Sequence, residues 1–415
     1  MTALRLALGV LALLGLAGAA YAESAVPTAK PEEVGLSATQ LKKIEEVTAR
    51  NIDEGIIPGA VMLVARRGKI AWVSVQGKRE PNGDAMKYDS IFRIYSMTKP
   101  MVTTALMQMV EEGRLQVTDP VSKYLPAMGE MKVATEVPGP GFKPMLKLAD
   151  PTRAMTVQDL MRHTAGLVYG NRGTSLVHQA YLNAKIGDRG ATNEEFVAKL
   201  SKMPLAYNPG DRWEYSVAVD VQGRLLEVLN GKPLRDVMAE RLYKPLGMTD
   251  TFFQVPADKL SRVAQPAPAT GGKTTTTRFK VDDGAKYESG GGGLMSTTED
   301  YLRFTAALAN GGALGGKRII GRKTLEFMTA NHIGDKPILR PSYGFGLGFE
   351  VRTSVGDAQQ AGSLGEYGWG GAAGTMFWVD PKEQLYAIYM IQANEADTGS
   401  LRQQFRSMVQ AALID

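Results

Sequence analysis

The chain has 415 residues, a formal net charge of +5, three histidines and no cysteine. The lack of cysteine excludes disulfide bonds, a thiol nucleophile and a thiolate metal site, and three histidines without an H-x-x-x-H pair argue against a histidine metal centre. Lysine and arginine are spread along the chain without a basic block, which argues against nucleic-acid binding. We therefore predict a protein without a metal or cofactor, and the sequence carries no signal for an oligomeric state.

The first segment predicts an export signal. Residues 1–22 carry a single charge, at Arg5, followed by an apolar run over 6–20 and a small-residue pattern that ends at Ala22. This is the layout of a secretory signal peptide, with cleavage expected before Glu23 and a periplasmic or secreted mature protein. The apolar run of about 15 residues is short for a membrane span, which needs about 20. No later segment is long and apolar enough, so we expect no membrane span in the mature protein.

The N-terminal part of the mature chain predicts a helix and a hairpin. Ser37 is a suitable N-cap for a helix that runs to about Glu54, where glycine and proline follow. Two apolar, β-branched runs, over 60–66 and 69–76, are joined by Arg67-Gly68. Runs of this length with a short polar turn between them are typical of a β-hairpin.

A similar pattern returns near the C-terminal end. Two apolar runs, over 374–379 and 385–391, flank an Asp380-Pro381 turn, and an amphipathic helix is predicted over 400–413. One end of the chain therefore shows a helix followed by two strands, and the other end shows the reverse. This symmetry predicts one antiparallel sheet assembled from both termini and flanked by helices.

The middle of the chain reads as helices broken by long loops. We therefore predict an α+β fold, in which 23–95 and 311–415 form an α/β sandwich domain and 96–310 form a mainly helical inserted domain. Two stretches, over 128–154 and 262–290, are predicted to be long loops rich in proline, glycine and threonine. Loops of this length often have a function, and we expect them to shape or cover a cleft.

The segment Ser96-Met97-Thr98-Lys99 carries the strongest chemical signal. It opens an apolar helical pattern that continues to Gly113, and residues three apart on a helix share a face, so the Ser96 hydroxyl and the Lys99 amine can meet. The helix N-terminus also supplies free N–H groups and a positive dipole end. The pattern predicts one amphipathic helix and a serine hydrolase that uses lysine in place of histidine. The alternative interpretation is a serine N-cap followed by a surface lysine.

Further motifs follow this segment. They are L-M-R-H-T-A-G-L over 160–167, W-E-Y-S over 213–216, G-L-M-S-T-T-E-D over 293–300 and G-W-G-G-A-A-G over 368–374. With these motifs the chain resembles the serine β-lactamase and penicillin-binding-protein superfamily, and within it the class C-like branch of β-lactamase-related esterases (family VIII carboxylesterases), over nearly all of the mature chain. The resemblance implies a β-lactamase-like fold with an α/β sandwich built from both termini, a helical insert, and an active site between them.

The resemblance assigns roles to three side chains. Ser96 is the nucleophile that forms an acyl-enzyme. Lys99 can act as the base only if burial or a nearby cation lowers its pKa from about 10.4 by about three units, or roughly 4 kcal/mol. Tyr215 is the second candidate base, because superfamily members place the tyrosine of a Y-x-N motif beside the serine and the lysine. Here Tyr215-Ser216-Val217 keeps the tyrosine and lacks the asparagine, and the identity of the base stays open.

Trp369-Gly370-Gly371-Ala372 falls where the superfamily's β-lactamases and peptidases carry Lys-Thr-Gly. In the resemblance, the backbone N–H groups of Ser96 and Ala372 form the oxyanion hole. Trp369 has no cation to hold a substrate carboxylate, which favours a neutral, apolar ester unless an arginine from a loop supplies the charge. Asp220 is a candidate anchor for Lys99 or for the start of the helix. The predicted substrate-binding residues are Trp369, Gly370, Gly371, Tyr169 and Asp220.

His163 is the residue that a search for a Ser-His-Asp triad would select. The sequence His-Thr-Ala-Gly-Leu recurs in the resembled family as a helix-to-loop turn, so we predict a structural role for His163. Tyr215 also has a competing interpretation, that of a buried tyrosine packed beside Trp213.

The predicted function is an exported serine hydrolase that cleaves short-chain carboxylic esters through an acyl-enzyme, with a small-molecule ester as its partner. The alternatives within enzymes are a β-lactamase, a D-Ala-D-Ala-type peptidase or amide hydrolase, and an acyltransferase. The alternative outside enzymes is a non-catalytic binding protein on the same fold. Retention of Ser96, Lys99 and Tyr215 argues against that last alternative, because a scaffold has no need of all three.

Overall fold

The computed structural model describes the residues 24–266, 280–393 and 398–415. The predicted signal peptide over 1–22, its cleavage site before Glu23 and residues 267–279 of the predicted loop lie outside the described residues. Within the described part of the chain, no helix combines the length and the apolar character needed to cross a bilayer.

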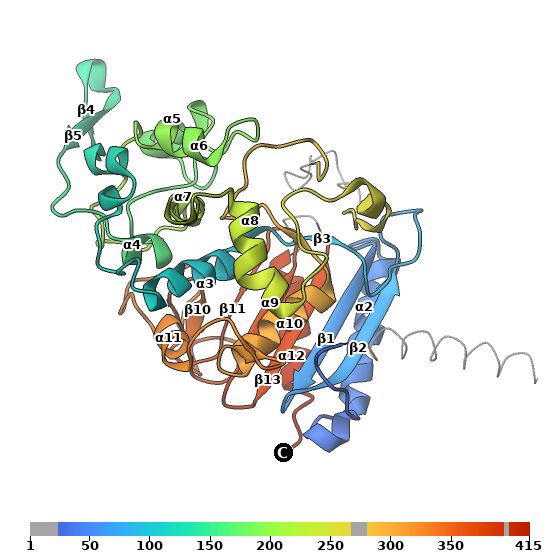
Figure 1. The fold of residues 1–415 in the computed structure, drawn as a ribbon. Helices are drawn as coiled ribbons and strands as arrows, with labels where there is room; N and C mark the ends of the chain where they lie inside the picture. Colours follow the sequence, from blue (N-terminus) through green and yellow to red (C-terminus); the bar gives the residue numbers. More distant parts are fainter. Residues whose placement is uncertain (1–23, 267–279, 394–397) are drawn as a thin grey trace, which may run out of the picture.

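An antiparallel sheet of seven strands forms the centre of the fold, in the order β2-β1-β13-β12-β11-β10-β9. The N-terminal strand β1 pairs with the C-terminal strand β13, with Ala60 opposite Ile391, so the two ends of the chain meet inside the sheet (Figure 1). This confirms the predicted antiparallel sheet built from both termini. The strands are β1 (Gly59–Arg66), β2 (Lys69–Gly77), β9 (Tyr343–Phe345), β10 (Glu350–Arg352), β11 (Tyr367–Gly370), β12 (Met376–Asp380) and β13 (Leu385–Ile391).

Helices cover both faces of the sheet. Successive side chains of a strand point to opposite faces of the sheet. Because both faces are covered, β1 is buried along its whole length. Leu63 faces the large core that includes α10 (Thr298–Ala309). Met62 faces a second core formed with α2 (Ala38–Asp53) and α12 (Thr398–Gln410). α10 lies against the sheet and therefore groups in space with the sandwich, although it precedes residue 311 in the chain. The predicted boundary between the two domains at residues 310 and 311 stays a prediction.

The middle of the chain forms the mainly helical region, drawn in green and yellow above the sheet in Figure 1. Its central element is α3 (Thr98–Glu111), whose side chains from Thr98 to Met109 are all buried. The expected amphipathic helix is therefore a helix buried on every side, because α7 (Ala218–Asn230) and neighbouring elements pack around it. Its polar groups have internal partners: Thr103 Oγ1 donates to Gln222 Oε1 at 2.9 Å, as burial requires.

The remaining elements are short. The helices are α4 (Val157–Met161), α5 (Leu176–Asn183), α6 (Asn193–Leu200), α8 (Leu234–Met238), α9 (Lys244–Leu246) and α11 (Arg322–Met328). The helical turns are η1 (Pro31–Val34), η2 (Tyr95–Met97), η3 (Val121–Lys123), η4 (Pro126–Glu130), η5 (Pro140–Phe142), η6 (Ala239–Tyr243) and η7 (Ala257–Arg262). Two-residue strands form the pairs β3 (Phe92–Arg93) with β6 (Met295–Ser296) and β7 (Ala313–Leu314) with β8 (Lys317–Arg318).

The expectation of a long loop over 128–154 is wrong. β4 (Val133–Pro138) and β5 (Pro144–Ala149) form an antiparallel hairpin there, which projects from the helical region in Figure 1. Most of its described side chains are exposed, so neither strand shows the apolar–polar alternation by which a half-buried strand is recognised. Its position at the outside of the helical region also means that it does not cover the sheet.

Candidate active site

Ser96 lies in a tight turn at the start of α3. The turn η2 runs directly into the helix, so Ser96 precedes the first helical residue, Thr98, by two positions. Tyr95 has a φ of +43°, a left-handed backbone conformation that is uncommon for a bulky residue. Residues strained in this way cluster at active sites. Here the strain falls immediately before the predicted nucleophile.

Lys99 is the buried cation beside Ser96, with only 1% of its surface exposed. Its Nζ donates to Ser96 Oγ at 3.3 Å, to Tyr169 Oη at 3.1 Å and to the carbonyl oxygen of Gly291 at 2.5 Å. Three acceptors match the three N–H donors of an ammonium group. The predicted contact between serine and lysine is therefore present.

Tyr215 is the second group on the Ser96 hydroxyl. Its phenol O–H donates to Ser96 Oγ at 2.6 Å, and its ring packs against Trp213 and Trp369 with centroid separations of 6.1 and 5.5 Å. Burial raises the pKa of Tyr215, but the positive charge of Lys99, 4.7 Å from the ring centre, and the hydrogen bond to Ser96 outweigh it, so this pKa lies below its ordinary value. A lowered pKa makes the phenolate, the proton-accepting form, easier to reach.

Asp220 and Tyr169 lie behind Lys99 and outside the pocket lining. Asp220, in the first turn of α7, accepts hydrogen bonds from Ser289 Oγ at 2.6 Å and from the Gly291 N–H at 3.1 Å, so it fixes the residue whose carbonyl holds Lys99. Burial and the charge of Asp220 raise the pKa of Tyr169 well above its ordinary value, which keeps it a neutral phenol. Tyr169 contacts Lys99 directly and Asp220 contacts the residue that binds Lys99, whereas neither lines the cavity as the predicted substrate-binding role would require.

The end of β11 packs directly against the turn that carries Ser96. A Cβ atom on Gly371 would lie 2.3 Å from the carbonyl oxygen of Ile94, so this close approach of two backbones requires glycine. Thr375 Oγ1 donates to the same carbonyl at 3.4 Å. Ala372 then lines the pocket together with Ser96. The two backbone segments of the predicted oxyanion hole are held side by side by this contact.

His163 is buried beside the site without a hydrogen bond to the nucleophile. It follows α4 with a φ of +58°, and its ring packs edge-on against Trp213 with a centroid separation of 6.0 Å. The Ser216 N–H donates to His163 Nδ1 at 3.3 Å. Burial lowers the pKa of His163 well below its ordinary value, so the ring is neutral. These contacts agree with the predicted structural role.

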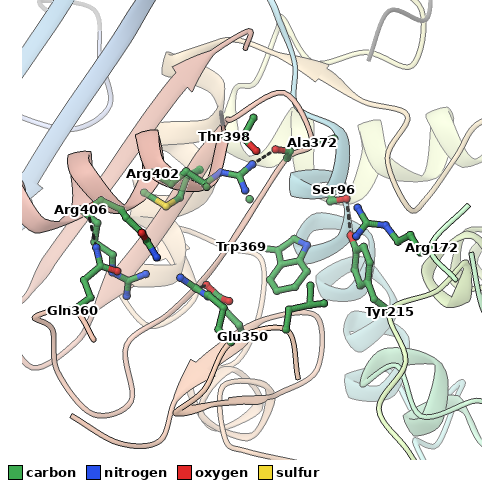
Figure 2. Close-up of a pocket in the computed structure, with 17 residues that line it drawn as sticks. Ser96, Arg172, Tyr215, Glu350, Gln360, Trp369, Ala372, Thr398, Arg402 and Arg406 are labelled. Atoms are coloured by element: carbon green, nitrogen blue, oxygen red, sulfur yellow. Dashed lines mark hydrogen bonds and ion pairs between the residues drawn. The ribbon is translucent and has the colours of Figure 1, made fainter. Parts of the chain in front are cut away.

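A cavity of about 250 Å³ opens beside Ser96 (Figure 2). Trp369 and Gly370 line it at the end of β11, just past Tyr367 and Gly368, the two residues that pair with β10. Among the described side chains, no group of three or more histidines or carboxylates is placed to hold a metal ion. The cavity is lined by Ser96, Arg172, Tyr215, Leu339, Arg340, Glu350, Gln360, Trp369, Gly370, Gly371, Ala372, Met376, Thr398, Gly399, Arg402, Gln403 and Arg406.

The sequence did not reveal which arginines line this cavity. In Figure 2, Arg402 and Arg406 lie on one side of Trp369, and Tyr215 and Arg172 lie on the other. The periodic pattern over 400–413 predicts α12 and identifies its polar face, but it carries no information about what that face meets. The position of α12 beside the end of β11 depends on the sheet order. The charged lining residues are Arg172, Arg340, Arg402, Arg406 and Glu350.

Comparison with known proteins identifies the family. The family model described as Beta-lactamase matches residues 44–407. Esterase EstB of Burkholderia gladioli is 30% identical over 411 residues, which cover 92% of this chain and 98% of EstB. An uncharacterized protein of Mycobacterium tuberculosis is 33% identical over 367 residues, covering 82% of this chain and 87% of that protein. The solved structure of EstCE1, described as a hydrolase with promiscuous acyltransferase activity, is 26% identical with a TM-score of 0.75 and covers 89% of this chain and 98% of its own. The chain belongs to the β-lactamase family and is a serine hydrolase.

Proposed function

We propose that this serine hydrolase cleaves short-chain carboxylic esters through an acyl-enzyme on Ser96. One observation carries the proposal: Lys99 and Tyr215 both donate to Ser96 Oγ, in a pocket where Trp369 stands at the position of the superfamily's lysine. A tryptophan gives the ester an apolar surface to pack against. The names of two relatives, an esterase and a hydrolase, support the same reaction.

Acylation begins with Tyr215 in its phenolate form. The Ser96 hydroxyl gives its proton to the phenolate while Oγ bonds to the ester carbonyl carbon. The backbone N–H groups of Ser96 and Ala372 stabilise the negative oxygen of the tetrahedral intermediate. When the bond to the alcohol oxygen breaks, Tyr215 returns the proton to that oxygen. A water molecule then repeats these steps on the acyl-enzyme, and the acid leaves with Ser96 restored.

In this mechanism Lys99 stays charged throughout. Its three N–H groups are all engaged, by Ser96, Tyr169 and Gly291, so the amine has no lone pair with which to accept a proton. Its positive charge instead stabilises the phenolate of Tyr215. The proposal therefore makes Tyr215 the general base and gives Lys99 an electrostatic and positioning role.

The test compares kcat/KM for p-nitrophenyl acetate and butyrate with kcat/KM for a chromogenic cephalosporin and a D-Ala-D-Ala peptide. We expect the esters to react faster than the other two. If the cephalosporin or the peptide is cleaved as fast as the butyrate ester, the esterase proposal is wrong and a β-lactamase or peptidase takes its place. If no compound is turned over and a fluorophosphonate leaves Ser96 unlabelled, the protein is a non-catalytic binder.

We also propose that the protein is exported and acts in the periplasm or outside the cell, on the basis of the N-terminal sequence pattern. N-terminal sequencing of protein purified from the soluble extracytoplasmic fraction should give Glu23 as the first residue. Recovery of Met1 or Thr2 from that fraction would contradict cleavage at this site.

A further inference from the structure

A second cavity lies at the other end of β12 from the active site. Met376, the first residue of β12, lines the active-site cavity, whereas Val379 and Asp380 at the end of the strand line the second cavity. The second cavity has a volume of about 530 Å³, which lies within the range of small-molecule binding sites. Among the described residues, the two cavities share no lining residue, so the second cavity is separate from the site beside Ser96.

The buried part of its lining is apolar. The buried apolar members belong to the large core that includes α10, and they are Val26, Ala306, Val379 and Tyr386. The polar side chains of the lining are exposed at the surface, and they are Arg67, Asn310 and Gln384. The cavity therefore has an apolar floor and a polar mouth, an arrangement that suits a mainly apolar small molecule.

Small residues of α10 leave the space for a ligand. Ala306 and Ala309 are three residues apart, so they lie on the same face of the helix, and both line the cavity. The N-terminal arm forms another wall through Pro27. Backbone hydrogen bonds hold this arm to the edge strand β2, because the Ile70 N–H donates to the carbonyl oxygen of Pro27 at 2.8 Å and the Ala29 N–H donates to that of Ile70 at 2.9 Å. The walls are therefore parts of the ordered fold.

Tyr386 supplies an unused hydrogen-bond donor to this cavity. The residue is only 2% exposed, and its hydroxyl has no hydrogen-bond partner among the described residues. A buried phenol usually finds a partner for its O–H group. Burial raises the pKa of Tyr386 above its ordinary value, which keeps the group a neutral donor. A hydrogen-bond acceptor on a bound molecule would satisfy it.

The charges around the cavity favour a neutral ligand. Arg67 is the cation in the lining, and its Nη2 already pairs with Asp415 at 2.7 Å. Asp380 is the carboxylate in the lining, but it follows Val379 in the strand, so its side chain points to the opposite face of the sheet. An anionic ligand would therefore compete with Asp415 for Arg67, and a cationic ligand would find no carboxylate of the described lining that faces it.

We propose that the second cavity binds a neutral, mainly apolar small molecule whose carbonyl oxygen accepts a hydrogen bond from Tyr386. The apolar body of the ligand packs against Val26, Ala306 and Val379 on the floor of the cavity. A ketone or a lactone has this chemistry, with one acceptor on an apolar frame. The site is independent of the proposed ester hydrolysis, because it shares no described lining residue with the cavity beside Ser96.

The test is a fluorine NMR titration of para-fluoroacetophenone into the Ser96→Ala protein, in which no serine hydroxyl at position 96 can add to the ketone. Adding Tyr386→Phe removes one neutral hydrogen bond and should weaken binding roughly two- to ten-fold. The matched control is Tyr389→Phe, because Tyr389 is equally buried on the same strand but belongs to the core on the other face. Tyr389→Phe should leave the dissociation constant of the ketone unchanged.

Two further arms locate the ligand and its acceptor. Ala309 is exposed at the edge of the cavity, so Ala309→Trp should fill the cavity and abolish binding while the protein stays folded by circular dichroism. Para-fluoroethylbenzene has no carbonyl group, and its binding should not change with Tyr386→Phe. Ketone binding that survives Ala309→Trp, that is insensitive to Tyr386→Phe, or that is undetectable in the Ser96→Ala protein overturns the proposal.

Discussion

The phenol oxygen of Tyr215 lies 2.6 Å from Oγ of Ser96, the same hydroxyl that Lys99 Nζ reaches at 3.3 Å. Both candidate bases therefore converge on one nucleophile, but their surroundings differ. Lys99 also donates to Tyr169 and to Gly291. In the proposed mechanism, Tyr215 is therefore the general base, and Lys99 has the electrostatic and positioning role.

Replacing Tyr215 by phenylalanine should remove the proton acceptor and preserve the packing of the ring against Trp213 and Trp369. For p-nitrophenyl butyrate we expect kcat/KM to fall by about 10²- to 10⁴-fold, the usual contribution of a general base, with little change in melting temperature. Tyr169→Phe is the matched control, because it removes a buried phenol that contacts Lys99. It should cost less activity, and an equal loss in both variants would show that the Tyr215 oxygen has no role of its own.

The pH dependence of the reaction should report the ionisation of Tyr215. The phenolate is the active form, and its pKa is lowered, so kcat/KM should rise with pH and reach its plateau below the ordinary tyrosine value of about 10. Lys99→Gln removes the charge that lowers this pKa. In that variant the rising limb should therefore move to higher pH, besides the loss in rate. A limb that stays at the wild-type pH would show that another group titrates.

His163→Ala should damage stability more than chemistry. The ring fills a buried space beside Trp213 and Tyr215, and emptying such a space in a core typically costs about 2–4 kcal/mol. Urea unfolding should show this loss, while kcat/KM of the folded variant should fall far less than in Tyr215→Phe. A loss of activity as large as that of Tyr215→Phe, with stability unchanged, would identify His163 as a catalytic base.

Asp159 should make the folded protein sensitive to acid. Its buried carboxylate accepts hydrogen bonds from Arg153 at 2.6 Å and from Thr164 at 2.8 Å. Burial alone would raise the pKa of Asp159, but these hydrogen bonds lower it to about 2. Because this folded-state value lies below the unfolded-state value of about 3.9, a stabilisation of about 2 kcal/mol is present above roughly pH 4 and is lost as the pH falls toward 2.

Urea unfolding near pH 6 and again near pH 2 measures this contribution. Between the two conditions the wild type should lose about 2 kcal/mol more stability than Asp159→Asn, following the linkage between pKa and folding. Asp150→Asn is the control, because its carboxylate is 84% exposed in a surface ion pair with Lys132, and such pairs contribute little. Equal acid losses in wild type and Asp159→Asn would contradict the assignment.

Local patterns predicted the parts of the fold that neighbours in sequence determine. Ser37 caps α2 as expected, since its Oγ accepts a hydrogen bond from the Gln40 N–H at 3.3 Å. The contact of Ser96 with Lys99 follows from their spacing of three residues. β1 and β13 are long apolar runs, so each can be recognised without its partner. The short strands β9 and β10, with three residues each, have too little sequence to show a period.

The features of the site that the sequence could not reveal depend on contacts between segments that are distant in the chain. Arg402 reaches the carbonyl of Gly371, 31 residues earlier in the chain, because α12 lies beside the end of β11. Asp220 acts on the Gly291 N–H, 71 residues away. Neither partner follows from a helical or strand period, since a period reports only which face of an element is apolar. The arginine in the pocket and the route from Asp220 to Lys99 therefore required the tertiary structure.

The pairing of β1 with β13 also means that the sheet beside the site can form only after the C-terminal strand has been synthesised. Ser96, Lys99 and Tyr215 emerge from the ribosome well before residues 385–391, yet β1 has its second neighbour in the sheet only when those residues are present. The last strand to be made is an inner strand of the sheet, and contacts this distant in sequence form slowly. We therefore expect a chain that lacks 385–415 to carry every proposed catalytic side chain without an assembled site.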